Sequence, residues 1–115
     1  MTRSRASAKQ AGTRFESAIV DYLASRGWRH AERRAKTGAL DKGDITGIPG
    51  VVIEAKDVAK ITLAEFLREA QVEAENAGAL VGAAWIKRRG KASPADAYVV
   101  MDGETFTHLL REAGY

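Results

Sequence analysis

The sequence predicts an α/β fold in which helices flank a mixed central β-sheet. Apolar patterns of helix and strand type follow one another in the order α-β-β-β-α-β-β-α, with no repeat and no low-complexity tract. The nearly continuous apolar run at residues 80–86 suits a strand that is covered on both faces. The 115 residues are enough for one hydrophobic core without disulfides. We therefore expect one domain.

The chain is expected to begin with a flexible arm and a helix. Residues 1–8 are small, basic and aperiodic, which predicts an arm ahead of a domain over residues 9–115. Apolar side chains then recur at helical spacing between Thr13 and Gly27, and the glycine is expected to end that helix. The side chains of this apolar stripe are Phe15, Ala18, Ile19, Tyr22 and Leu23.

Short strands and turns are expected after the first helix. The β-branched content of residues 51–56 predicts a strand, and the glycines and proline of residues 47–50 predict the turn before it. The other segments expected here are an edge strand at 28–33, a turn-rich loop at 36–43 and a short strand at 44–46.

The second helix is the best defined element of the sequence. Thr62 and Glu65 have the spacing of a capping box, and Gly78 is expected to end the helix. Its apolar stripe is Leu63, Phe66, Leu67, Ala70, Ala74 and Ala77. The remaining expected elements are a buried strand at 80–86, a basic loop at 87–91, a strand at 97–101, a turn at 102–103 and a last helix whose inner face is Phe106, Leu109, Leu110 and Ala113.

Composition excludes several classes of protein. The chain has no cysteine, and its two histidines, His30 and His108, lie far apart in sequence, which argues against zinc fingers and most zinc hydrolases. No apolar run is long enough for a signal peptide or a membrane span, so we expect a cytoplasmic protein without membrane contact.

Charge is unevenly distributed along the chain. Residues 1–43 hold ten basic and four acidic residues, a net charge of +6, whereas residues 44–115 carry a net charge of −3. A basic first third suggests a polyanionic partner, of which nucleic acid is the commonest, although a solvated basic surface explains the charge equally well.

Glu54 and Lys56 interrupt an otherwise apolar strand. They are two residues apart, so both side chains leave the same face of the sheet, where a buried charge is costly unless it is paired or bound to a cation. If the two strands are antiparallel around the 47–50 turn, Asp44 approaches Glu54. Converging carboxylates without His or Cys favour Mg²⁺ or Mn²⁺.

Glu16 joins this group by helix geometry, because it lies on or beside the apolar stripe of the first helix. Each residue also has an ordinary explanation. A Glu-x-Lys strand pair can be solvated or paired at an edge, Glu16 can form a capping box with Thr13, and Asp44 can belong to a turn. The ordered combination of these features favours a site.

In this order the residues resemble the PD-(D/E)xK nuclease superfamily. The segments Gly12-Thr13-Arg14-Phe15-Glu16, Leu23 to Trp28 and Arg33-Arg34 resemble, more narrowly, archaeal-type Holliday junction resolvases. The resemblance covers about residues 10–90 and implies a restriction-endonuclease-like fold. One departure is Gly43, which stands where the family usually has a proline before the first aspartate.

The resemblance implies a metal-dependent, structure-selective DNA endonuclease that nicks Holliday junctions symmetrically, as a homodimer, in DNA recombination and repair. Asp44 and Glu54 would hold Mg²⁺, with Mn²⁺ as a possible substitute, aided by the carbonyl of Ala55. Lys56 would position or activate the attacking water and stabilise negative charge, and Glu16 would complete the site. Gln71 on the second helix is a supporting candidate, with a solvated glutamine as the alternative.

Basic residues near this site are candidates for DNA contacts. Those around the loop before Asp44 would contact the phosphate backbone, and those of the 87–91 loop would either grip a second stretch of DNA or blunt a sheet edge with charge. The candidates are Arg14, Arg33, Arg34, Lys36, Thr37, Lys42, Lys87, Arg88 and Arg89. Two alternative functions remain: a restriction- or repair-type nuclease on duplex, flap or single-stranded DNA, and a non-catalytic DNA-binding protein of the same fold.

Overall fold

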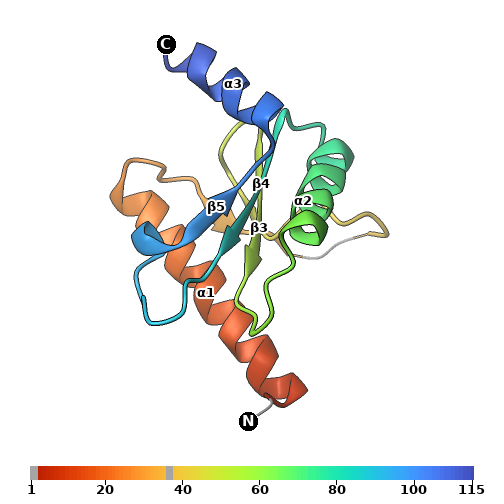
Figure 1. The fold of residues 1–115 in the computed structure, drawn as a ribbon, viewed down its shortest axis with the longest axis vertical. Helices are drawn as coiled ribbons and strands as arrows, with labels where there is room; N and C mark the ends of the chain where they lie inside the picture. The colour runs from red at the N-terminus through yellow and green to blue at the C-terminus, as the bar shows by residue number, and fades with distance from the viewer. Residues whose placement is uncertain (1–2, 36–37) are drawn as a thin grey trace.

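The computed structural model describes residues 3–35 and 38–115, in which three helices flank one five-stranded sheet (Figure 1). The element order is the one predicted, with a short 3-10 helix added before the last strand. The elements are α1 (Arg5–Ser25), β1 (Glu32–Arg33), β2 (Ile45–Thr46), β3 (Val51–Lys56), α2 (Leu63–Ala77), β4 (Val81–Ile86), η1 (Pro94–Asp96), β5 (Tyr98–Val100) and α3 (Gly103–Glu112).

The sheet is mixed, as predicted. Its strands lie in the order β1-β2-β3-β4-β5, and all neighbours are antiparallel except β3 and β4, which are parallel. Helix α2 makes the crossover between these two parallel strands, which need a long connection. β3 is therefore the central strand, and its carboxyl end lies beside that of β4.

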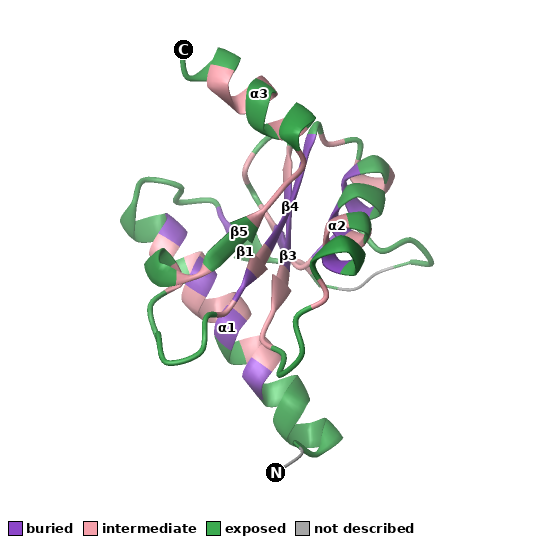
Figure 2. Ribbon diagram, in the orientation of Figure 1, coloured by how far each residue is buried: buried purple, intermediate pink, exposed green. Residues whose placement is uncertain are grey.

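Helices α1 and α2 cover opposite faces of the sheet (Figure 2). On one face, the apolar stripe of α1 packs against Ile45 of β2 and Ile53 of β3. On the other face, Phe66 and Ala70 of α2 pack against Ala84 and Ile86 of β4. Because side chains alternate along a strand, Glu54 and Lys56 belong to the face that α2 covers.

Helix α1 begins earlier than the sequence patterns indicated. The Ser4 side chain accepts a hydrogen bond from the backbone N–H of Ser7, which caps the helix so that it starts at Arg5. Residues 5–8, expected in the flexible arm, are thus helical, and Thr13 lies inside the helix instead of capping it. The predicted end holds, because Gly27 follows with φ +106°.

Two other local features differ from the prediction. The first strand is only Glu32–Arg33, because residues 28–31 form a turn in which the N–H of Ala31 donates to the carbonyl of Trp28 at 3.3 Å. At the start of α2, the Thr62 hydroxyl donates to the Glu65 carboxylate at 2.9 Å and makes no capping bond to the backbone. Gly78 ends α2 in the left-handed conformation, as predicted.

Gly82 sets how closely α2 approaches the sheet. A Cβ at this position of β4 would collide with the backbone carbonyl of Ala70 and would lie 2.9 Å from the Cβ of Ala74. The helix can therefore rest directly on the strand only because residue 82 has no side chain. This contact brings the side chains of α2 close to β3.

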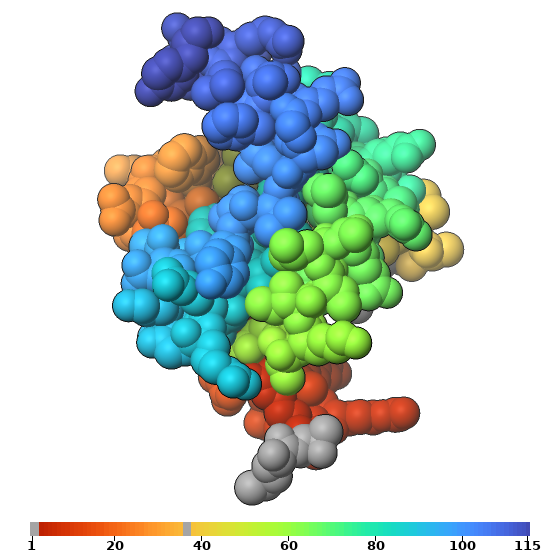
Figure 3. All heavy atoms as spheres, in the orientation of Figure 1, coloured from red at the N-terminus to blue at the C-terminus, as the bar shows by residue number. Residues whose placement is uncertain are grey.

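Helix α3 does not cover the sheet, contrary to the prediction. None of its residues is buried, Phe106 is 53% exposed, and the helix projects from one end of the molecule (Figure 3). The sequence pattern identified an apolar face, but within the described chain that face is only partly covered: Leu109 and Leu110 are half-buried and Phe106 is exposed. In the same described part of the protein, no helix has the length and apolar character that crossing a membrane requires.

Candidate metal centre

Asp44, directly before β2, lies beside Glu54 of the neighbouring antiparallel strand β3, as the sequence predicted. The backbone N–H of Asp44 donates to the carbonyl of Ile53 at 3.0 Å, in the antiparallel ladder that pairs Ile45 with Ile53. Oδ2 of Asp44 accepts a hydrogen bond from the N–H of Ala55 at 2.9 Å. The carbonyl of Ala55 points to the same side of the strand as its N–H, and so toward Asp44.

A second carboxylate from α2 faces Glu54. Glu73 is 3% exposed and Glu54 is 8% exposed, and both have an Oε2 atom without a hydrogen-bond partner among the described residues. With Asp41, from the loop before β2, they form a group whose oxygens lie within 4.8 Å of one another. Such a group is costly to bury unless it shares protons or binds a cation.

Burial dominates the electrostatics of this group. It raises the pKa of Glu54 well above the ordinary range, and the nearby carboxylates of Glu73 and Asp44 raise it further, while Lys56 opposes the shift. Burial also raises the pKa of Glu73, with Asp41 and Asp44 adding to the shift and the hydrogen bond with Glu54 opposing it. The two carboxyl groups therefore titrate as a pair that retains a proton near neutral pH.

Lys56 lies beside this cluster and is held by carboxylates. Its Nζ is 2.5 Å from Oε2 of Glu69 and 3.5 Å from Oε1 of Glu54, and it lies 5.0 Å from the centre of the Phe66 ring. Burial lowers the pKa of the ammonium, but Glu69 and Glu54 outweigh that effect, so the pKa of Lys56 is raised. Lys56 is thus a permanent cation next to the acidic group.

Gly43 shapes the loop that delivers Asp41 and Asp44. Its φ is +92°, and a Cβ there would collide with Val52 and lie 3.5 Å from Oε2 of Glu73. Proline, whose ring fixes φ near −65°, cannot adopt this conformation. The departure from the family motif noted in the sequence therefore corresponds to a different backbone path beside the cluster.

Glu16 lies on the other side of the sheet. Its carboxylate accepts from Nε of Arg33 at 3.4 Å, and α1 packs on the face opposite Glu54 and Lys56. The structure places Glu16 in the Arg33 ion pair and outside the Asp41–Glu54–Glu73 group. The amide of Gln71, likewise, donates to Asp102 at the start of α3, at 2.7 Å.

Sequence reasoning missed three acidic residues at the site, namely Asp41, Glu69 and Glu73. The sequence did contain an indication that Glu73 is buried, because Glu73 follows Ala70 by three residues and Phe66 by seven and so lies within the apolar stripe of α2. The sequence contained no such indication for Glu69 and Asp41, because the position of Glu69 depends on the packing of α2 and that of Asp41 on the path of the loop.

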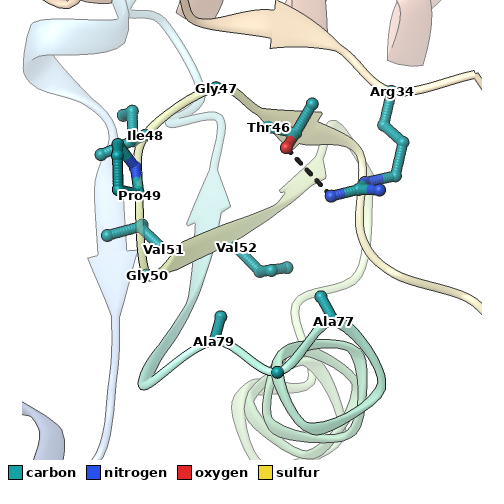
Figure 4. A pocket seen from close by; sticks show the side chains of 11 residues that line it. Arg34, Thr46, Gly47, Ile48, Pro49, Gly50, Val51, Val52, Ala77 and Ala79 are labelled. Carbon is teal, nitrogen blue, oxygen red and sulfur yellow. Dashed lines mark hydrogen bonds between the residues drawn. The ribbon is translucent and has the colours of Figure 1, made fainter.

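The candidate DNA-binding residues lie in several separate places, with Arg33 exposed on β1. Arg34 lines a cavity of about 310 Å³ beside the 47–50 turn, where its Nη2 donates to Oγ1 of Thr46 at 2.9 Å (Figure 4). A larger groove of about 810 Å³ lies at the carboxyl ends of β3 and β4, and its basic residues are Arg3, Lys87, Arg88, Arg89 and Lys91. Arg14 is exposed on α1, Lys42 is exposed beside Gly43, and Lys36 and Thr37 lie outside the described residues.

Comparison with known proteins gives no relative. No protein-family model, no curated protein and no solved structure matches this chain. The chemistry of the site therefore rests on the geometry described above.

Proposed function

We propose that this protein is a metal-dependent, structure-selective DNA endonuclease of the Holliday junction resolvase type. The observation that carries the proposal is the arrangement on β3. Glu54 lies beside Asp44 and faces Glu73. Lys56 follows Glu54 by two residues, so its ammonium lies on the same face of the strand. A buried acidic cluster next to a fixed cation suits the hydrolysis of a phosphodiester.

The residues present fit a divalent metal ion. Oε2 of Glu54 and Oε2 of Glu73 have no hydrogen-bond partner within the described residues, and a cation would satisfy both. Every side chain of the cluster offers only oxygen, which suits Mg²⁺ or Mn²⁺ and disfavours zinc. Asp44, Glu54 and the carbonyl of Ala55 are the ligands that the resemblance implies.

Phosphodiester hydrolysis needs an in-line water and stabilisation of negative charge on the phosphate and the leaving oxygen. A bound Mg²⁺ supplies charge neutralisation and lowers the pKa of a water molecule. Lys56 contributes a second positive charge, and its contacts with Glu54 and Glu69 hold its Nζ beside the acidic cluster. Because the pKa of Lys56 is raised, this residue acts as a charge and hydrogen-bond donor and not as the general base.

The proposed substrate is branched DNA, recognised by shape and phosphate position in the cytoplasm of a cell or of a virus-infected cell. The described residues form one α/β unit around a single sheet, and recognition by shape and phosphate position needs no separate module that reads bases. The exposed Arg33 of β1 and the basic groove at the ends of β3 and β4 are suited to phosphate contacts.

Symmetric cleavage of a four-way junction requires two active sites and therefore two copies of this chain. A C₂ dimer needs a self-complementary surface, and the uncovered apolar face of α3 offers one. Phe106 lies on this helix, which projects away from the catalytic cluster, so dimerisation there would leave both sites open to DNA.

A cleavage assay on a labelled four-way junction, beside matched duplex and flap DNA, tests the function. We expect paired nicks near the crossover with Mg²⁺ and none with Asp44→Ala, whose DNA binding persists; the exposed Asp96→Ala is the matched control. Equal cleavage of linear duplex would favour a restriction- or repair-type nuclease. Binding without cleavage under every divalent ion would leave the non-catalytic DNA-binding protein.

A further inference from the structure

The face of the sheet that carries Glu54 is covered by α2, and the third acidic side chain at the cluster comes from that helix. Glu73 lies on the buried side of α2, where Gly82 lets the helix rest directly on β4. Its Oε2 lies near the backbone of Gly43, at 3.5 Å from the position that a Cβ would take there. Glu73 therefore points into the space between α2, β3 and the loop that carries Asp41.

The oxygens of Asp41, Glu54 and Glu73 are spaced for a shared ion. They lie within 4.8 Å of one another. Each ligand of an octahedral Mg²⁺ lies about 2.1 Å from the ion, so opposite ligands are about 4.2 Å apart and adjacent ligands about 3.0 Å apart. Any three ligands include at least two adjacent pairs, so the three carboxylates must draw closer together to coordinate one ion.

Two buried oxygens indicate that a shared proton or a cation belongs in this space, and a cation would displace the proton. Glu54 and Glu73 are both more than nine-tenths buried, and neither Oε2 meets a hydrogen-bond partner in the described part of the chain. The nearest cation, Lys56, contacts the other oxygen of Glu54, at 3.5 Å, and is also bound by Glu69. Lys56 therefore leaves Oε2 of both glutamates unsatisfied.

We propose that Glu73 is a ligand of the metal ion, together with Glu54 and Asp41, and takes the place that the resemblance gives to Glu16. Glu16 belongs to α1, on the opposite face of the sheet, where its carboxylate accepts from Arg33. The proposal rests on the metal site of the proposed function and changes which residues form it. The ion is a divalent cation that prefers oxygen, such as Mg²⁺ or Mn²⁺.

Mn²⁺ binding to the full chain without DNA tests the ligand set directly. The affinity is measured by electron paramagnetic resonance of free Mn²⁺ and repeated with Mg²⁺ as competitor. We expect Glu73→Gln to weaken Mn²⁺ binding at least about tenfold, the scale seen when groups around a metal are changed. Glu75→Gln, an exposed residue of the same helix, and Glu16→Gln should bind Mn²⁺ as the unchanged protein does.

Asp41→Asn provides a second test, because Asp41 is exposed and its substitution does not disturb the core. It should also weaken Mn²⁺ binding.

Two results would overturn the proposed ligand set even if the protein cuts DNA: an unchanged Mn²⁺ affinity in folded Glu73→Gln, or an equal loss of affinity in Glu16→Gln. Conversely, Mn²⁺ binding that depends on Glu73 in a protein that cuts no DNA would support the ligand set and reject the nuclease function. No Mn²⁺ binding at millimolar concentration would overturn both.

Discussion

The ammonium of Lys56 lies 2.5 Å from the carboxylate of Glu69, one turn of α2 before Glu73. The central strand and α2 therefore meet through an ion pair at Lys56 as well as through the acidic cluster. Glu69 keeps Lys56 protonated and fixes its position, but under the proposed function it would also compete with a phosphate of the DNA for the same ammonium.

Replacing Lys56 separates charge stabilisation from DNA binding. We expect Lys56→Ala to lower kcat by about 10²–10³-fold, the range for losing one donor to a developing charge, with little change in the Kd for a junction. Single-turnover cleavage and fluorescence anisotropy measure the two quantities, with exposed Lys60→Ala as the control. Full activity in Lys56→Ala would show that Lys56 has no part in the reaction.

The buried carboxyl pair predicts an unusual dependence of stability on pH. In the folded, metal-free protein the pKa of Glu73 is raised. Between the ordinary pKa of glutamate and this raised value, the folded protein holds a proton on Glu73 that the unfolded chain has lost. Stability is therefore greatest in acid and falls as pH rises toward the folded pKa. Glu73→Gln should raise the unfolding free energy at pH 8 by about 1–3 kcal/mol and change it little at pH 4.

Thermal unfolding with chelator present measures this effect at both pH values. Exposed Glu75→Gln is the control and should shift neither midpoint. A loss of stability at pH 8 in Glu73→Gln would contradict the buried, partly protonated pair. Saturating Mg²⁺ should stabilise the unchanged protein more than Glu73→Gln, because only ligands of the folded state shift its stability.

Introducing a proline at position 43, where the nucleases that the sequence resembles usually have one, should damage this protein. Gly43→Pro cannot reach φ +92°, and its side chain would meet Val52, so we expect a loss of about 1–3 kcal/mol in unfolding free energy. Urea denaturation measures the loss, and Gly12→Ala, at a helix position with open space for a Cβ, is the control. A proline variant as stable as the starting protein would mean that the loop path is not fixed by Gly43.

The basic groove should determine how DNA binding depends on salt. Each phosphate contact that is removed lowers the slope of log K against log salt by about 0.9 on duplex arms. Changing Lys87, Arg88 and Arg89 together to alanine should weaken binding to all DNA shapes and reduce the slope, whereas exposed Arg111→Ala on α3 should not. An unchanged slope would assign this loop to the alternative role of protecting the sheet edge.

The apolar face of α3 should control the oligomeric state. Phe106→Glu is expected to turn a dimer into a monomer without lowering the stability of the domain, because Phe106 is 53% exposed. Mass photometry and light scattering measure the mass, and exposed Thr107→Glu serves as the control. Two results would reject α3 as the dimer surface: the unsubstituted protein is a monomer, or the Phe106→Glu variant is still a dimer.

The order of helices and strands could be predicted from the sequence, because the spacing of apolar residues within each segment depends only on that segment. The convergence of Asp44 and Glu54 could be predicted as well, since a short turn dictates antiparallel strands. The position of Glu73 could not, because it depends on how deeply α2 rests on β4. For the same reason the pattern of α3 identified an apolar face, but not that none of its residues would be fully buried in the described chain.

Gly82 lies in β4 beneath the buried side of α2 and sets the position of the acidic residues that this helix carries, although none of them is among the atoms nearest to it. A single methyl group at this position would lift the helix, and Glu69 and Glu73 would move away from Lys56 and Glu54 together. The distance between two layers of the fold is thereby also the width of the proposed catalytic centre. A change at residue 82 would therefore alter the affinity for the metal ion and the Lys56–Glu69 ion pair together, although glycine itself has no functional group.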